Sequence, residues 1–208
     1  MLGDLSSRHL KSETAWAGTG AFSGKNWATY FIYTVTSTSL LEGWTIETNS
    51  IYSGVSEHAD AIYFSAGEIG AQAYIYKAFT SQSGFTYSLK VQNPPWWDFL
   101  MLITGSVPMM YANPRISLRW GFPLPHFELN GVDVTGVLTN PSQWYTLKLV
   151  VEPDPYTVNA QVYSENGDLI GSATVTNPTL SFTDISYVGC GVSSHSAALV
   201  KDIVITGG

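Results

Sequence analysis

The sequence is short of charged residues. Asp, Glu, Lys and Arg make up 12% of its 208 residues, about half of the roughly 25% that is usual in globular proteins. Uncharged polar and aromatic residues must therefore fill much of the surface. Such a surface suits a protein outside the cytosol, or one with a face that packs against copies of itself. The plainer explanation is that long β-sandwiches carry fewer charges than helical proteins.

Basic residues and cysteine are scarce as well. The chain has nine Lys and Arg against a net charge of −7, and no segment concentrates the basic ones. Phosphate binding needs clustered basic residues, so nucleic acid is not expected as a partner. The single cysteine, Cys190, excludes an intramolecular disulfide. It lies in a strand-like run, which favours a buried structural thiol over a nucleophile.

Long apolar runs are missing too. The longest, Phe99 to Ile103, has five residues, far short of the roughly 20 that a membrane-spanning helix needs. The N-terminal residues show no apolar core of a signal peptide. From the surface composition we still expect a place outside the cell, or on a cell or virion surface. A processed mature chain would reconcile this expectation with the absence of a signal-peptide pattern.

Helical periodicity is nearly absent, and short β-branched and aromatic runs recur between Gly, Pro, Asn and Ser clusters. This spacing is typical of a β-sandwich or barrel. We expect an arm or loosely packed first strand over residues 1–25 and one all-β, antiparallel two-sheet sandwich over residues 26–208. The predicted strands span residues 27–36, 43–51, 60–65, 71–80, 84–92, 98–104, 115–120, 126–129, 143–151, 159–163, 169–176, 185–192 and 197–206.

Turn residues support several of these boundaries. Asn130-Gly131 and the run from Glu165 to Asp168 predict hairpin turns, because Asn and Gly tolerate positive φ. Pro153 is expected to close the strand before it, since proline cannot donate to a sheet ladder. Strands without intervening helices predict antiparallel pairing.

Alternation along three of the strands indicates which side chains share an outward face. The outward residues are Gln72, Tyr74 and Tyr76 in one strand, Thr86, Ser88, Lys90 and Gln92 in another, and Arg115, Ser117 and Arg119 in the third. If the three strands are neighbours, they form one polar, aromatic and basic surface. We predict ligand contacts there from Gln72, Tyr74, Arg115 and Arg119; an ordinary solvated sheet face is the alternative.

The segment Pro94-Pro95-Trp96-Trp97 is the most informative short run. Adjacent tryptophans in a strand point to opposite faces, so one indole is expected to meet solvent or a partner. An exposed indole stacks well on the apolar face of a sugar ring, which makes Trp96 and Trp97 candidate sugar contacts. The alternatives are that both indoles close the end of the sandwich core, or that they form a subunit contact.

The order of strand types from about residue 84 onward resembles the concanavalin A-like lectin/glucanase superfamily, which includes laminin G-like domains and many carbohydrate-binding modules. The resemblance rests on the strand Tyr87–Val91, the strand Arg115–Trp120, the run Phe127–Gly131, the strand Gln143–Val151, the hairpin Gln161–Gly171 and the closing strand Val200–Ile205. It covers roughly residues 43–206. It is a pattern of strand types rather than a specific motif.

The resemblance implies a jelly roll of two curved sheets, with carbohydrate bound on the concave sheet or at loops along one edge. It also leaves calcium open, because members often bind it through loop carboxylates and carbonyls. The four histidines lack zinc-site spacing, and the turn-proximal acids Asp133, Asp168 and Asp202 form no cluster in the sequence. We therefore assign no metal ligands and expect no cofactor.

Hydrolases of this superfamily carry a Glu-x-Asp-x-Glu strand, which this chain lacks. Retaining glycosidases need two carboxylates about 5–5.5 Å apart. The nearest candidates are Glu47, in a predicted strand, and Glu57 with Asp60, in a predicted loop. They are weak candidates, and catalysis is disfavoured.

These observations favour a non-enzymatic carbohydrate-binding or surface-recognition domain. One alternative is a structural subunit of a virion surface or extracellular filament, which predicts self-association. It is supported by the low charge, the apolar loop over residues 106–113 and the N-terminal arm. The other alternative is a glycoside hydrolase or polysaccharide lyase with an atypical site.

Overall fold

The computed structural model describes residues 31–34, 39–80, 83–92, 98–107, 112–120, 125–140 and 142–207. This part of the chain has fifteen strands, the short 3-10 helix η2 (Phe182–Asp184) and no α-helix. It holds no helix that is long and apolar enough to cross a membrane.

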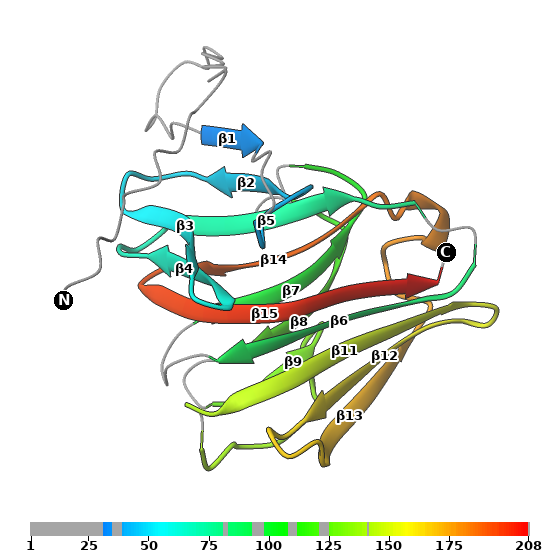
Figure 1. Cartoon of the computed structure of the whole chain (residues 1–208). Coiled ribbons are helices and arrows are strands. Elements are labelled where there is room, and N and C mark those ends of the chain that lie inside the picture. Colours follow the sequence, from blue (N-terminus) through cyan, green and yellow to red (C-terminus); the bar gives the residue numbers. More distant parts are fainter. Residues whose placement is uncertain are drawn as a thin grey trace.

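The strands form two antiparallel sheets that face each other (Figure 1). Sheet A has the order β1-β2-β5-β14-β7-β8-β9-β10. Its strands are β1 (Phe31–Thr34), β2 (Thr45–Thr48), β5 (Gln72–Ala78), β14 (Tyr187–Ser193), β7 (Asp98–Thr104), β8 (Arg115–Trp120), β9 (Phe127–Leu129) and β10 (Val132–Asp133).

Sheet B has the order β13-β12-β11-β6-β15-β4-β3. Its strands are β13 (Leu169–Thr176), β12 (Tyr156–Tyr163), β11 (Trp144–Pro153), β6 (Phe85–Gln92), β15 (Ser196–Gly207), β4 (Ala61–Ala66) and β3 (Ser53–His58). In the view of Figure 1 most of sheet B lies in front of sheet A. The two-sheet antiparallel sandwich confirms the predicted fold class.

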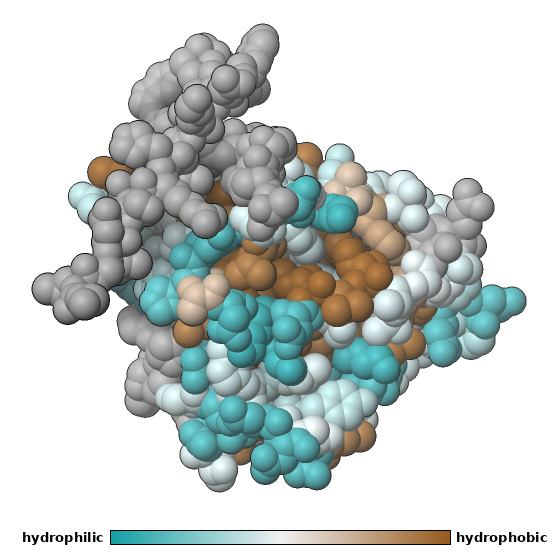
Figure 2. All heavy atoms as spheres, viewed as in Figure 1, coloured by the Kyte–Doolittle hydropathy of each residue, from teal (hydrophilic) through white to brown (hydrophobic). Residues whose placement is uncertain are grey.

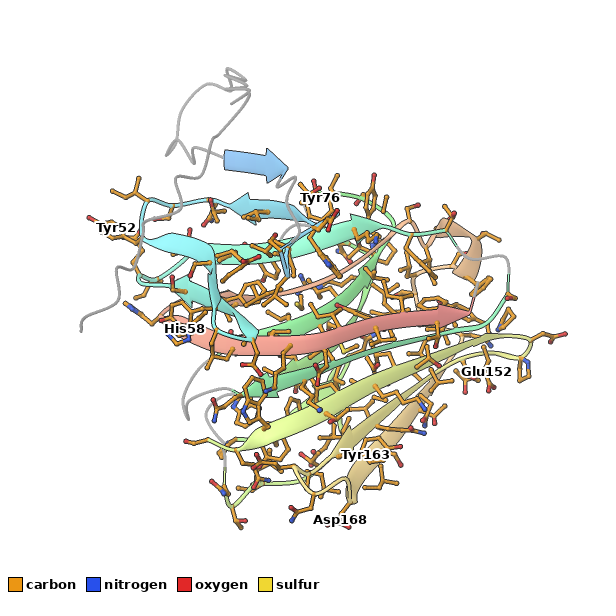
Figure 3. All side chains as sticks on the ribbon, in the orientation of Figure 1. Tyr52, His58, Tyr76, Glu152, Tyr163 and Asp168 are labelled. Carbon is orange, nitrogen blue, oxygen red and sulfur yellow. The ribbon has the colours of Figure 1, made fainter. Side chains whose placement is uncertain are left out.

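Alternating side chains from both sheets fill the space between them (Figure 3). The rings of Trp120 and Phe127 on sheet A contact Tyr145 on sheet B, with centroids 5.8 and 5.7 Å from its centroid. All three side chains are at most 2% exposed. Cys190 is also fully buried, as predicted, and burial raises the pKa of its thiol. Large rings in edge and tilted contact therefore tie the two sheets together.

Most predicted boundaries hold, and two expectations fail. Asn130 and Gly131 have φ of +47° and +83° in the β9–β10 turn, and β11 ends at Pro153. The sequence pattern missed two strands: β3, because Ser, Gly, Glu and His have weak strand propensity, and the two-residue β10. The expected surface shared by three strands is wrong, because β6 belongs to sheet B while β5 and β8 belong to sheet A.

One half of β15 lacks a neighbour on one side. Strand β4 pairs with β15 from Ser196 to Val200 only, whereas β6 pairs with it as far as Gly207. Ile203 and Ile205 consequently pack against the core while staying partly exposed. Figure 2 shows an apolar area in the middle of this view, beside β15.

Candidate functional site

The outward face of sheet A carries a continuous line of polar side chains. Ser193 on β14 stands opposite both Gln72 on β5 and Asp98 on β7. Arg119 on β8 stands opposite Glu128 on β9. Together with His126 these residues form the polar line: Gln72, Ser193, Asp98, Arg119, Glu128 and His126.

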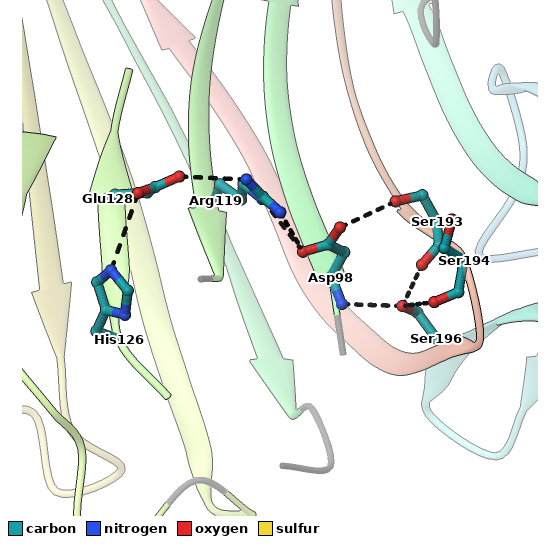
Figure 4. A network of polar contacts seen from close by, with 7 residues as sticks. All are labelled: Asp98, Arg119, His126, Glu128, Ser193, Ser194 and Ser196. Carbon is teal, nitrogen blue, oxygen red and sulfur yellow. Dashed lines mark hydrogen bonds and ion pairs between the residues drawn. The ribbon is translucent and has the colours of Figure 1, made fainter. Parts of the chain in front are cut away.

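Arg119 is the centre of the polar line (Figure 4). Its Nε and Nη2 donate to Asp98 Oδ1 at 3.1 and 2.7 Å, and its Nη1 lies 3.5 Å from Glu128 Oε1. His126 Nε2 lies 3.9 Å from Glu128 Oε2 and forms an ion pair when protonated. Two carboxylates therefore hold one guanidinium in a fixed orientation, in charge-assisted contacts.

Serine residues at the start of β15 and the end of β14 anchor Asp98 (Figure 4). The Asp98 backbone N–H donates to Ser196 Oγ at 2.9 Å, and the Ser193 hydroxyl donates to Asp98 Oδ2 at 3.4 Å. Ser196 Oγ in turn donates to the backbone oxygens of Ser193 and Ser194. The first residue of β7 is thus tied to both sheets, which fixes the middle of the polar line.

An apolar cluster lies beside the polar line on the same face. It consists of Tyr74 and Tyr76 on β5, Leu100 and Leu102 on β7, and the partly buried Tyr187 on β14. Gly191 lies between the two pairs, and a Cβ there would come within 2.3 Å of the Tyr74 ring. The Tyr74 ring therefore occupies space that only glycine leaves free. We call these five residues the outer apolar cluster.

Burial and charge set the state of the groups at this site. Desolvation raises the pKa of Tyr74, which lies among Arg115, Glu47, Asp98 and Arg119. Desolvation, and next the charge of Glu47, raise the pKa of Tyr76. Both phenols are therefore protonated at neutral pH. The Gln72 Oε1 atom is buried and has no hydrogen-bond partner within the described residues, so an acceptor is left unsatisfied at one end of the polar line.

The arrangement of strands is shared with lectins. No family model matches this chain, and no curated protein matches it. Among solved structures, lectin I-B4 from Griffonia simplicifolia has a TM-score of 0.60 at 6% identity, over 79% of this chain and 92% of the lectin. The lectin from Bauhinia forficata in complex with GalNAc has a TM-score of 0.54 at 10% identity, over 86% and 96%.

A legume lectin-like domain from Entamoeba histolytica shows the same likeness, with a TM-score of 0.55 at 8% identity over 81% of this chain and 92% of the domain. The fold is that of the concanavalin A-like lectins. At these identities the likeness establishes the fold alone. What the lectin-like fold does in this chain depends on its own side chains.

The lectin-like fold places all four described residues that the sequence predicted as ligand contacts on one face of sheet A. Gln72 and Arg119 belong to the polar line, and Tyr74 lies beside it. Arg115 is four residues from Arg119, about 13 Å along the strand, and its charge acts on Tyr74. Trp96 and Trp97 lie outside the described residues, so their sugar contacts stay a prediction.

The outward residues of β6 are on the other side of the sandwich. Lys90 pairs with Asp202 on β15 at 2.7 Å and faces outward from sheet B. Alternation identified the correct face of this strand, but it carries no information about which sheet the strand joins.

The three weak catalytic candidates do not form a facing pair. Glu47 is 1% exposed on β2 of sheet A. Glu57 and Asp60 are exposed at the β3–β4 hairpin of sheet B. Glu57 lies within β3 rather than in the predicted loop, and its Oε1 accepts a hydrogen bond from the Leu41 N–H at 3.3 Å. Asp60 lies in the turn, where it pairs with Lys201 at 2.8 Å.

No group of three His, Cys, Asp or Glu that could hold a metal occurs within the described residues. The aspartates considered for calcium are spread over the fold. Asp133 accepts a hydrogen bond from the Gly136 N–H, Asp168 lies at the β12–β13 turn, and Asp202 pairs with Lys90.

The sequence carries no signal that marks Asp98, Glu128, His126, Ser193 or Ser196 as site residues. Each is an ordinary polar residue at a strand end or on an outward face. Only the strand register shows that these residues form one line, so the missing signal was the order of strands in sheet A.

Proposed function

We propose that this lectin-like domain binds neutral carbohydrate, without catalysis, at the polar line on the outward face of sheet A. The observation that carries the proposal is the Arg119 guanidinium held between Asp98 and Glu128, with all three side chains partly exposed. Sugars present adjacent hydroxyl groups, each a donor and an acceptor. A fixed row of donors and acceptors is the complement of such a ligand.

The hydrogen-bonding capacity of the polar line supports this. A guanidinium has five N–H groups. Within the described residues, Nε and Nη2 donate to Asp98, and Nη1 lies 3.5 Å from Glu128, so further N–H groups can donate to ligand oxygens. The carboxylates of Asp98 and Glu128, which are partly exposed, can accept from ligand hydroxyls. Donors and acceptors therefore alternate along the line.

The charge balance favours an uncharged ligand. Arg119 supplies one positive charge and Asp98 and Glu128 supply two negative ones, so the polar line is negative while His126 is neutral. An anionic sugar would meet net repulsion there. Tyr74 and Tyr76 of the outer apolar cluster are 2% and 8% exposed, so binding at the polar line rests on hydrogen bonds rather than on stacking. The likeness to lectins, one of them solved with GalNAc, supports the same ligand class.

A glycan array followed by calorimetric titration of the best glycan tests the proposal. Arg119→Ala is expected to weaken binding at least tenfold, because it removes the central donor. Arg119→Lys is expected to weaken binding too, since an ammonium cannot reproduce the planar fork. Lys90→Ala is the matched control: it breaks an ion pair on sheet B and should leave affinity unchanged.

Two outcomes would contradict the proposal. One is the absence of any glycan that binds the wild-type chain. The other is equal loss of affinity in Arg119→Ala and Lys90→Ala, which would place the binding elsewhere. Trp96→Ala and Trp97→Ala in the same series test whether either indole contributes to binding.

A further inference from the structure

A hollow lies on the outward side of sheet B, across the sandwich from the polar line. It has a volume of about 200 Å³ and is lined by Tyr63, Gln92, Ser142, Ala197, Ala198 and Leu199. Pockets for drug-sized ligands usually measure roughly 300–1,000 Å³. The hollow is therefore suited to something smaller, of the size of one sugar ring.

The strand register explains why a hollow forms here. Leu199 on β15 stands between Tyr63 on β4 and Gln92 on β6, and all three face outward. In the next outward row, Ala197 stands opposite Ser65. A row of large side chains thus borders a row of small ones. This difference in side-chain size leaves a recess beside the Tyr63 ring, which is 38% exposed.

The polar groups at the hollow are held in place. Gln92 Nε2 donates to the Ser142 backbone oxygen at 2.8 Å, so its Oε1 is oriented as an acceptor. The hollow therefore combines the aromatic ring of Tyr63, an aliphatic surface and the fixed amide of Gln92. This combination matches a sugar ring, which has an apolar face and a hydroxyl rim.

The nearby positive charge is neutralised. Lys201 Nζ lies 2.8 Å from Asp60 Oδ2 and 4.5 Å from the centre of the Trp144 ring. The ammonium is bound by a carboxylate and an aromatic face at once. An anionic ligand would have to displace Asp60 to reach it, so the surroundings of the hollow favour a neutral ligand.

We propose that the hollow lined by Tyr63, Gln92 and Leu199 is a second binding site, which takes one neutral sugar ring stacked on Tyr63. It is independent of the polar line, because it belongs to the other sheet. Both sites lie at one end of the sandwich: Ser196 contacts Asp98, while the next residue, Ala197, lines the hollow. Two sites on opposite faces would let one domain bridge two glycan branches.

Saturation-transfer NMR and calorimetry with N-acetylgalactosamine, galactose, mannose and glucuronate test this site. Ala197→Trp fills the hollow, and Tyr63→Ala removes the ring on which the sugar stacks. Each is expected to weaken the hollow's binding of a neutral sugar at least fivefold. Ser172→Trp adds the same bulk at an exposed position of β13 on the same face and should change nothing.

Counting the sites separates this proposal from the preceding one. The wild-type chain is expected to bind two equivalents of a neutral sugar, and both Ala197→Trp and Arg119→Ala are expected to bind one. If Tyr63→Ala and Ala197→Trp both bind as the wild type does, the hollow is not a site, whatever Arg119→Ala shows. If Arg119→Ala is the only one of these variants that binds sugar as the wild type does, the polar line is not a binding site, whereas the hollow is still supported as one.

The preference of the hollow for a neutral ligand can be tested separately. Asp60→Asn leaves Lys201 without its carboxylate partner, so glucuronate binding is expected to increase relative to wild type while neutral sugars bind as before. Preference for glucuronate over neutral sugars in the wild-type chain would overturn the assignment to neutral ligands.

Discussion

The central strands of the two sheets bury their side chains differently. In β6 of sheet B, buried and half-buried residues alternate along all eight positions. In β7 of sheet A, six consecutive residues after Asp98 are buried. The neighbouring strands β14 and β5 repeat this unbroken burial over most of their length. Sheet B therefore has one buried face, while the centre of sheet A is buried on both.

This difference comes from the side chains that sheet A turns outward. Leu100 and Leu102 face the same side as Tyr74 and Tyr76, and Gly189 and Gly191 separate them on β14. The bare backbone of Gly191 leaves space that the Tyr74 ring occupies. The polar line is thus set beside an apolar layer. The hollow on sheet B has no such layer, and apart from the buried Ala198 its lining residues are half-buried or exposed.

Truncation of a leucine on the outward face of sheet A is the strongest test of this comparison. Leu102→Ala is expected to lower the free energy of unfolding by about 2 to 5 kcal/mol, as for a core residue, because Leu102 is fully buried. Ser88→Ala, on the outward face of β6, is expected to change it by less than about 0.5 kcal/mol. Urea titration measures both. Similar values for the two variants would erase the distinction between the sheets.

Adding one methyl group to β14 is the next test. Gly191→Ala would place a Cβ 2.3 Å from the Ala73 oxygen and the Tyr74 ring, and it is expected to cost about 1 to 3 kcal/mol. The matched control is Gly54→Ala in β3 of sheet B, where the nearest atom would be 3.8 Å away. Thermal unfolding compares them; a neutral Gly191→Ala would mean that the Tyr74 ring does not need this space.

The coupling free energies of the ion pairs on the two outward faces are expected to differ less than the stabilities of the variants above. A double-mutant cycle on Asp98 and Arg119, half-exposed, is expected to give a coupling of about 1 kcal/mol, after allowance for solvent screening. The more exposed Lys90–Asp202 pair is expected to give less than about 0.5 kcal/mol. Equal couplings would show that the outer apolar cluster does not shield the polar line.

The smallest effect concerns Asp60 at the surface of sheet B. The hydrogen bond and the charge of Lys201 lower the pKa of Asp60 below its usual 3.8. The pair's contribution to stability is therefore present above that usual value and is lost as the pH falls through the lower folded value. NMR titration should show the Asp60 pKa rising toward 3.8 in Lys201→Ala. An unchanged pKa would mean that the pair does not persist in solution.

Local signals in the sequence were enough for much of the fold. Alternation in Arg115–Trp120 correctly separated the buried Ile116, Leu118 and Trp120 from the outward Arg115, Ser117 and Arg119. Asn130-Gly131 correctly predicted a turn, because a positive φ costs these residues little free energy. Strand β3 was not predicted because it is a polar edge strand, and edge strands bury too little side-chain surface to need an apolar pattern.

The site depended on information that no local pattern holds. Gln72 and Asp98 are 26 positions apart in the chain, yet both stand opposite Ser193. Nothing in the residues around either one specifies that neighbour, because strand order is decided by which pairing buries the most apolar surface over the whole sandwich.

Scarce charge, short β-branched runs and well-placed turns thus determined by themselves that this chain forms an antiparallel sandwich and which side of most strands faces inward. These are properties of single strands, set by periodicity and backbone preference. The tertiary structure alone decided that β6 lies across the sandwich from β5 and β8, that Arg119 sits between two carboxylates, and that Leu102 is buried on an outward face. The physical reason is that these features arise from contacts between strands distant in sequence.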